Sequence, residues 1–412
     1  MLKKSKLLSQ FVANTNTVRI FTGSAGKINP KKNTFTHNST PYRLGILISC
    51  TFGISHCAHI LLNIIPATQG DGTTKASSHK TQVLMDRVAY GVMFTMVNYI
   101  TLQSSFAMIK NGHLLESFFN GLIQLDEEYF NNTGSERYDL SSYNKWKVGV
   151  AKYFLFFLRI MGVRISSFVI GIAAAKHPQG FMNILLYPPG SYLVNVWSIL
   201  PFPKISSILA KGTIFVLTSW ANMVLVNVCF LDVAQVAVGG VALSQMIYMQ
   251  LRHVNRIPLL KLVTFHRRIQ LLTNTFNQIH STMIVSILMA ALSSQIRSAL
   301  KLVNIIKGND DSNVGVRLYY VRVLLTSIVI INTVFGYFAD VNYFSLELVG
   351  QMRRVASISN QRFKRYQVMR KMTNSLQGLK IKFGSDNYVD TLTPFIFQQF
   401  AADRVIDALL LG

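Results

Sequence analysis

The hydrophobic pattern divides the chain into long apolar segments separated by polar, mostly basic connections. Six segments have about the twenty residues that an α-helix needs to cross a bilayer, and most carry few or no charges. Arg159 and Arg164 in the third segment and Arg322 in the sixth must face other helices or water, because an arginine facing lipid is costly. The six predicted spans are Leu44–Ile65, Val88–Ile109, Tyr153–Ala175, Gly212–Leu231, Ser281–Val303 and Leu318–Phe338.

A seventh, more polar helix is predicted at the end of the chain. Thr393 offers a capping hydroxyl, and Pro394 follows at the helix position where a missing N–H is tolerated. From Pro394 to Leu411 the helix would be about 27 Å long, close to the thickness of a bilayer's hydrocarbon core. This segment is therefore long enough to cross a membrane.

The seventh helix carries an acidic stripe. Gln399, Asp403 and Asp407 recur every four residues and therefore lie on one face. A membrane helix with such a stripe is typical of a helix that lines a water-filled path, because charges facing lipid are costly. The alternative is an amphipathic tail outside the membrane, in which Arg404 pairs with Asp407.

Composition supports a membrane protein. Half of the residues are hydrophobic and only 14% are charged, whereas soluble domains carry about 25% charged residues. The three cysteines, Cys50, Cys57 and Cys229, lie in apolar runs. They predict neither a disulfide framework nor a metal site.

The net charge of +24 is distributed unevenly along the chain. In a soluble protein this charge would suggest nucleic acid as a partner, but here most Lys and Arg residues lie in alternate connections. The basic connections are residues 1–43 and the segments that follow the second, fourth and sixth spans. Since Lys and Arg favour the cytoplasmic side, the amino terminus is predicted to be cytoplasmic and the carboxyl terminus extracellular.

These features together resemble one receptor family. The closest local match is Lys380-Ile-Lys-Phe-Gly384, followed by Tyr388-Val389 and by Thr393-Pro-Phe395. With seven predicted spans, a cytoplasmic amino terminus and a long basic last connection, the chain resembles the insect odorant and gustatory receptor superfamily. It lacks the Thr-Tyr and late Gln-Phe of the gustatory branch, and Gln399-Phe400 comes early. The branch therefore stays open.

The resemblance implies a fold and a division of the chain. The expected fold is an all-α membrane protein with seven transmembrane helices and a helical cytoplasmic anchor, assembled as a homo- or hetero-tetramer around a cation pore. The expected parts are a basic cytoplasmic segment 1–43, helices 1–6 in 44–338 with cytoplasmic extensions at about 232–278, an anchor 339–393 and a pore-lining helix 394–412. For the extensions, a helix held on the membrane surface by anionic lipid is the alternative.

The resemblance also implies site residues. The expected pore-lining residues are Gln399, Asp403 and Asp407, with Val405, Ile406, Leu409 and Leu410 as an apolar gate. The ligand would bind in the outer half of the bundle, in an apolar, aromatic cavity. Core packing is the alternative explanation for each cavity residue. The cavity residues are Tyr90, Met93, Phe94, Phe168, Ile172, Phe215, Trp220, Tyr319, Tyr320 and Val323.

The expected function is therefore a chemosensory receptor that acts as a ligand-gated, non-selective cation channel. Its partners would be a small-molecule tastant or odorant, cations and membrane lipid. No nucleic acid, cofactor or metal is expected to bind. The protein is expected in the plasma membrane of a sensory neuron.

Two other classes were considered. No enzyme is expected, because His56 and His59 lie near no carboxylate and no phosphate-binding glycine pattern is present. A secondary transporter is the main alternative, with intramembrane coupling charges and no internal repeat found in the sequence. Its candidate charges are Arg159, Arg164, Asp232, Arg322 and Asp403.

Overall fold

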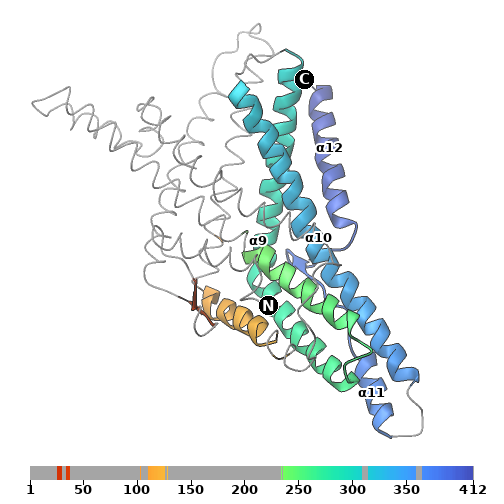
Figure 1. Ribbon diagram of the computed structural model, residues 1–412. Helices are drawn as coiled ribbons and strands as arrows, with labels where there is room; N and C mark the ends of the chain where they lie inside the picture. The colour runs from red at the N-terminus through yellow and green to blue at the C-terminus, as the bar shows by residue number, and fades with distance from the viewer. Residues whose placement is uncertain are drawn as a thin grey trace, which may run out of the picture.

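The structure of the chain is a computed structural model, and the part that it describes is mainly helical (Figure 1). It begins with two short antiparallel strands, β1 (Gly26–Asn29) and β2 (Thr34–His37). Helical segments 110–125 and 235–252 precede the long helices of the carboxyl-terminal half. The predicted spans 44–65, 88–109, 153–175 and 212–231 lie outside the described residues, apart from Gln103. The described residues are 26–29, 34–37, 103, 110–125, 128, 233, 235–308, 314–358 and 364–411.

Two long helices form the frame of this half. Helix α9 (Leu259–Ile306) runs up one side, and α10 (Val314–Ile358) returns beside it (Figure 1). In the described part of the chain, these are the two helices that are long and apolar enough to cross a membrane. The predicted spans 281–303 and 318–338 lie inside them. Each helix therefore continues without a break into the polar segment that the sequence analysis assigned to the cytoplasm.

The length of α9 has a local cause. Pro258 precedes it, and the helix itself contains neither proline nor glycine, the residues that most often break a helix. It ends at Ile306, and Gly308, with a φ of 75°, closes the last turn by donating its N–H to the Ile305 carbonyl oxygen.

The core lies where segments 110–125 and 235–252 meet the lower halves of α9 and α10. The Phe276 ring is 5.5 Å from the Phe118 ring and 5.9 Å from the Phe338 ring, measured between centroids. Leu262, Val263 and Ile269 are buried in the same cluster, and Leu259 and Leu272 pack against it. The apolar side chains of the first turns of α9 therefore pack into the protein core, and the anchor role of this segment stays a prediction.

Helix α11 (Lys364–Asn374) is followed by an extended connector that α9 and α10 hold through side chains. The Arg353 guanidinium donates to the carbonyl oxygens of Thr373, Asn374 and Leu376 at 3.4, 3.4 and 2.9 Å. The Ser345 hydroxyl accepts the Leu379 N–H at 2.7 Å. Two helices far away in sequence thus satisfy backbone groups that the connector cannot pair within itself.

His266 and Asn277 on α9 complete this set of contacts. Burial lowers the pKa of His266, although its bond to Gln377 opposes the shift, so the ring is neutral and Nε2–H donates to the Gln377 carbonyl oxygen at 3.1 Å. The Asn277 amide donates to the Lys380 carbonyl oxygen and accepts the Lys382 N–H, each at 2.9 Å. We call Arg353, Ser345, His266 and Asn277 the connector clamp.

The connector ends in a small hairpin of β3 (Lys382–Phe383) and β4 (Asn387–Tyr388). Gly384 has a φ of 74°, a conformation that favours glycine, and its N–H donates to the Ser281 carbonyl oxygen at 3.0 Å. The hairpin is therefore fixed to α9 at the residue where the predicted fifth span begins.

Replacing Asn277 by Leu tests the connector clamp. Two buried or partly buried backbone groups would lose their partner, and each unpaired group costs about 1–3 kcal/mol. We expect a clearly lower midpoint of thermal unfolding for the detergent-solubilised variant. Asn274→Leu, at an exposed position on the same helix, is the control and should change the midpoint little. Equal midpoints for both variants would contradict a stabilising role for Asn277.

A pair of glycine substitutions tests the close packing of segment 235–252. A Cβ at Gly240 would lie 2.3 Å from an atom of the buried Phe338 ring, whereas a Cβ at Gly336 would meet no atom within 4 Å. We expect Gly240→Ala to destabilise the fold by about 1–3 kcal/mol, because overpacking forces the ring to shift. Gly336→Ala should be neutral or stabilising, since alanine favours helix. Thermal unfolding of the two variants side by side measures the difference.

Candidate functional site: the terminal helix

Helix α12 (Thr393–Leu411) coincides with the predicted seventh helix, but its cap differs from the prediction. The Asp390 carboxylate accepts the N–H groups of Leu392 and Thr393, and the Thr393 hydroxyl accepts the Asp390 N–H in return. This is a reciprocal cap in which Asp390 has the capping position and Thr393 lies in the first turn. The prediction that Thr393 is the cap was therefore wrong, because an aspartate three residues earlier satisfies two N–H groups at once.

The cap also fixes the charge of Asp390. The Thr393 hydroxyl donates to its carboxylate at 2.7 Å, and this bond, together with the backbone N–H groups of Thr393 and Leu392, holds the pKa of Asp390 below its ordinary value. The start of α12 is thus tied to an ionised carboxylate at neutral pH, where a negative charge is favourable for a helix.

One face of α12 packs against α9 and α10. Ala401 is only 1% exposed, and the Phe397 ring lies 5.4 Å from the Phe335 ring and 5.9 Å from the Phe383 ring. Pro394, Val405 and Leu409 are half-buried and fall on the same side at helical spacing. This inner face attaches the terminal helix to its own chain.

A polar contact lies within the inner face. The Gln295 amide on α9 donates from Nε2 to the Gln398 Oε1 at 2.6 Å. The remaining polar atoms of the pair, Gln295 Oε1 and Gln398 Nε2, are buried without a hydrogen-bond partner. Such a bond between helices contributes about 0.6–2 kcal/mol in a membrane. No local sequence signal marks Gln398 for this contact, because its partner is 103 positions away.

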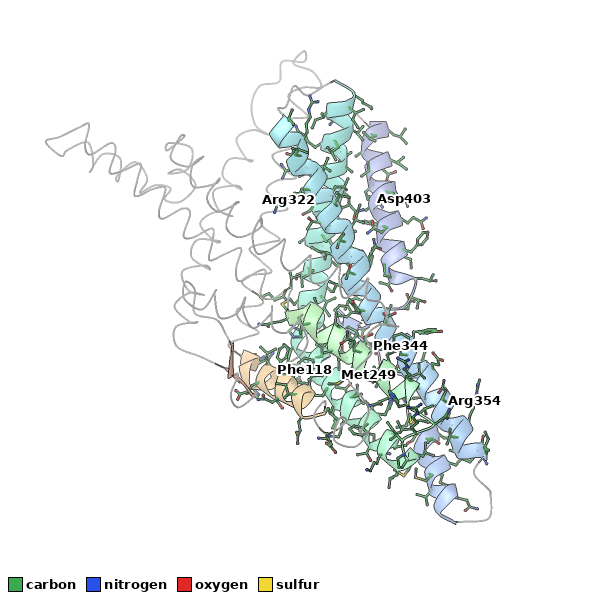
Figure 2. All side chains as sticks on the ribbon, viewed as in Figure 1. Phe118, Met249, Arg322, Phe344, Arg354 and Asp403 are labelled. Carbon is green, nitrogen blue, oxygen red and sulfur yellow. The ribbon has the colours of Figure 1, made fainter. Side chains whose placement is uncertain are left out.

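The opposite, outer face of α12 carries the predicted acidic stripe. Gln399, Asp403 and Asp407 are all exposed, and Asp403 lies on the side of α12 away from α9 and α10 (Figure 2). Large apolar side chains share this face and are also exposed. They are Ile396, Ile406 and Leu410, whereas Phe395 is exposed on the flank between the two faces.

Arg404 lies beside this stripe and modifies its charge. Its guanidinium donates to the Asp407 carboxylate at 3.0 Å, and its carbon Cζ lies 5.1 Å from the centre of the Phe400 ring. Both partners of the ion pair are more than half exposed, at 56% and 54%. Asp407 is therefore partly neutralised within its own helix, whereas no ion pair is found for Asp403 within the described residues.

The four residues predicted as an apolar gate lie on different faces. Ile406 and Leu410 are exposed on the acidic face, whereas Val405 and Leu409 are half-buried on the inner face. The pore-lining role of all seven predicted residues stays a prediction, and Ile406 and Leu410 have the placement that it requires.

Most of the predicted ligand-binding residues fall outside the described part of the chain. Tyr320 and Val323 are half-buried in the first turns of α10. Among the residues that the structure describes, no group of histidine, cysteine or carboxylate side chains has the arrangement of a metal site. The other predicted cavity residues lie outside the described part of the chain. They are residues 90, 93, 94, 168, 172, 215 and 220 and the side chain of Tyr319.

The whole chain matches solved structures of known proteins. No protein-family model and no curated protein matches its sequence. The insect olfactory receptor OR5 from Machilis hrabei in complex with eugenol matches with a TM-score of 0.58 at 14% identity, over 98% of this chain and 99% of that chain. A second structure of OR5 from Machilis hrabei matches with a TM-score of 0.54 at 13% identity, over the same shares. The chain therefore has the fold of this insect olfactory receptor.

Proposed function

We propose that this protein is a chemosensory receptor of the plasma membrane that acts as a ligand-gated, non-selective cation channel. The observation that carries the proposal is the two-faced terminal helix. Its inner face is attached to α9 and α10, while Gln399, Asp403 and Asp407 are exposed on the other face. The fold shared with an olfactory receptor supports the same function.

Membrane placement follows from the apolar parts of three helices. On α9 and α10 the polar residues Asn277 and Asp340 lie next to the predicted spans, and α12 begins at the same level, since Phe397 contacts Phe335. We place 281–303, 318–338 and α12 across the bilayer and the lower halves of α9 and α10 in the cytoplasm. The basic lower segments agree with this orientation.

The exposed acidic face supports a pore shared by several copies. A carboxylate facing lipid is costly, so Asp403 needs water or protein beside it. In the proposed tetramer, the outer faces of four α12 helices would surround an aqueous path, and their carboxylates would concentrate cations by Coulomb attraction. Ile406 and Leu410, on the same face, would narrow the path when closed.

The ligand would be a small, largely apolar molecule. The matched receptor binds eugenol, a small aromatic compound, and the predicted cavity residues are aromatic and aliphatic. Binding in the outer half of the bundle would open the channel by favouring the open arrangement of the α12 helices, which requires a higher affinity for that state.

A secondary transporter is less well supported. Coupling charges of transporters lie at buried sites near the middle of the membrane, between repeated halves. Asp403, the transporter candidate on α12, is instead exposed on the face turned away from its own bundle.

Neutralising the acidic stripe tests the pore. We expect Asp403→Asn combined with Asp407→Asn to lower single-channel cation conductance roughly twofold or more, because the pore loses its negative charge. Each single variant removes one negative charge per α12 and should lower the conductance less than the double variant does. Patch-clamp recording of the expressed protein measures both. Asp386→Asn, on the exposed hairpin turn, is the control, and an unchanged conductance in the double variant would contradict the pore assignment.

Removing the positive charge of Arg404 should raise the cation conductance, whereas removing the aspartates should lower it. Arg404→Gln frees the Asp407 carboxylate, so each α12 gains one negative charge, and we expect higher conductance and stronger preference for cations over anions. Reversal potentials in asymmetric salt measure the preference. Arg354→Gln, which removes an equal charge from the far end of α10 (Figure 2), should leave both quantities unchanged. A fall in conductance for Arg404→Gln would contradict an offsetting role.

A further inference from the structure

The β3–β4 hairpin is amphipathic. Ile381 and Val389 are completely buried, and Phe383 packs against the same core. Lys382 lies directly opposite Tyr388 in the register, so their side chains share the other face. Lys380 lies two residues before Lys382 and therefore points to that face as well. One face of the hairpin thus presents two lysines and a tyrosine.

Both lysines contact the Tyr388 ring. The Nζ atoms of Lys380 and Lys382 lie 5.1 and 5.5 Å from the centre of the Tyr388 ring. The backbone at both lysines is fixed by Asn277 of the connector clamp. Each ammonium group is attracted to the Tyr388 ring, and the two contacts gather two positive charges around one tyrosine.

The carboxylates of this segment are engaged elsewhere. Asp386 accepts the Ser385 hydroxyl at 2.8 Å, and Asp390 caps α12. Neither lysine has a carboxylate within ion-pair distance in the part of the chain that the structure describes. The hairpin therefore presents two positive charges around the exposed Tyr388 ring, with Lys380 exposed and Lys382 half-buried.

The position of the hairpin narrows the class of anion. Gly384 is bonded to Ser281, where the proposed membrane-spanning part of α9 begins. Large apolar side chains at the start of α12, Leu392 and Phe395, are 63% and 67% exposed next to the hairpin. A cationic site beside exposed apolar side chains at the membrane boundary matches a molecule with an anionic head and apolar chains.

We propose that Lys380, Lys382 and Tyr388 bind the headgroup phosphate of an anionic phospholipid in the cytoplasmic leaflet. The lysines would contact phosphate oxygens, the tyrosine hydroxyl would donate to them, and the acyl chains would cover Leu392 and Phe395. The lipid would then stabilise the position of the start of α12. This inference rests on the membrane placement proposed above, but it does not require channel activity.

Retained lipid tests the site directly. The full-length protein is purified in detergent with equal amounts of phosphatidylserine and phosphatidylcholine, and bound lipid is counted by native mass spectrometry. We expect the unmodified protein to retain phosphatidylserine preferentially. Lys380→Gln with Lys382→Gln should reduce this retention about tenfold or more, and Lys380→Gln alone about fivefold, from the attraction of each lysine to an anionic lipid surface.

Matched variants distinguish lipid binding at the hairpin from a general attraction of anionic lipid to surface lysines. Lys261→Gln with Lys371→Gln removes two exposed lysines from the cytoplasmic helices and should leave retention unchanged. Lys380→Arg with Lys382→Arg keeps the charge and should retain the lipid. Equal retention by the unmodified protein and the Lys380→Gln and Lys382→Gln double variant, an equal loss in the Lys261 and Lys371 control, or loss in the arginine variant would each overturn the proposal.

A competition experiment separates lipid from free phosphate. Inorganic phosphate at millimolar concentration should not displace phosphatidylserine, because it has no acyl chains to contact Leu392 and Phe395. Displacement by phosphate would assign the site to a soluble anion and overturn the lipid proposal. Because these measurements need no current, loss of lipid binding is distinguishable from loss of the proposed channel function.

Discussion

The described part of this protein depends on the hydrogen bonds that α9 and α10 supply to the connector before α12. Residues 375–381 form neither helix nor strand. The Ser375 and Leu376 N–H groups bond back into α11 and the Ile381 carbonyl oxygen accepts the Val389 N–H, but further backbone groups need partners from outside the segment. Arg353, Ser345, His266 and Asn277 supply the missing partners from two helices that are already fixed by the aromatic core. These hydrogen bonds attach the connector to α9 and α10, and the hairpin and α12 follow it directly in the chain.

The attachment of α12 explains why its two faces differ. Phe397, Ala401 and Gln398 bind it to its own chain, and the direct polar bond on this face is between two uncharged amides. The charged side chains are on the other face, where the isolated chain leaves them exposed. Placing charge on the outer face avoids burying it within one chain, and it makes that face suited to water or to another copy.

Several contacts lie at the boundary between the polar and the apolar halves of the long helices. The Gly384 bond to Ser281, the contact of Phe383 with Phe397 and the cap of α12 by Asp390 all lie where the polar halves of the helices meet the apolar halves. A movement of α12 would therefore have to change these contacts at its start. The connector clamp lies just below this boundary, and the lysine face of the hairpin lies at it, so both are placed to influence the start of the terminal helix.

The sequence by itself determined the elements whose signal is local. Its apolar segments predicted the upper parts of α9 and α10, and the four-residue spacing of Gln399, Asp403 and Asp407 predicted their common face, because helical periodicity depends on neighbouring residues alone. Only the tertiary structure decided which face of α12 is packed and that Val405 and Leu409 lie on the inner side. It also revealed the Gln295–Gln398 bond and the connector clamp. These depend on contacts between residues up to 111 positions apart, and such contacts leave no periodic pattern in the sequence.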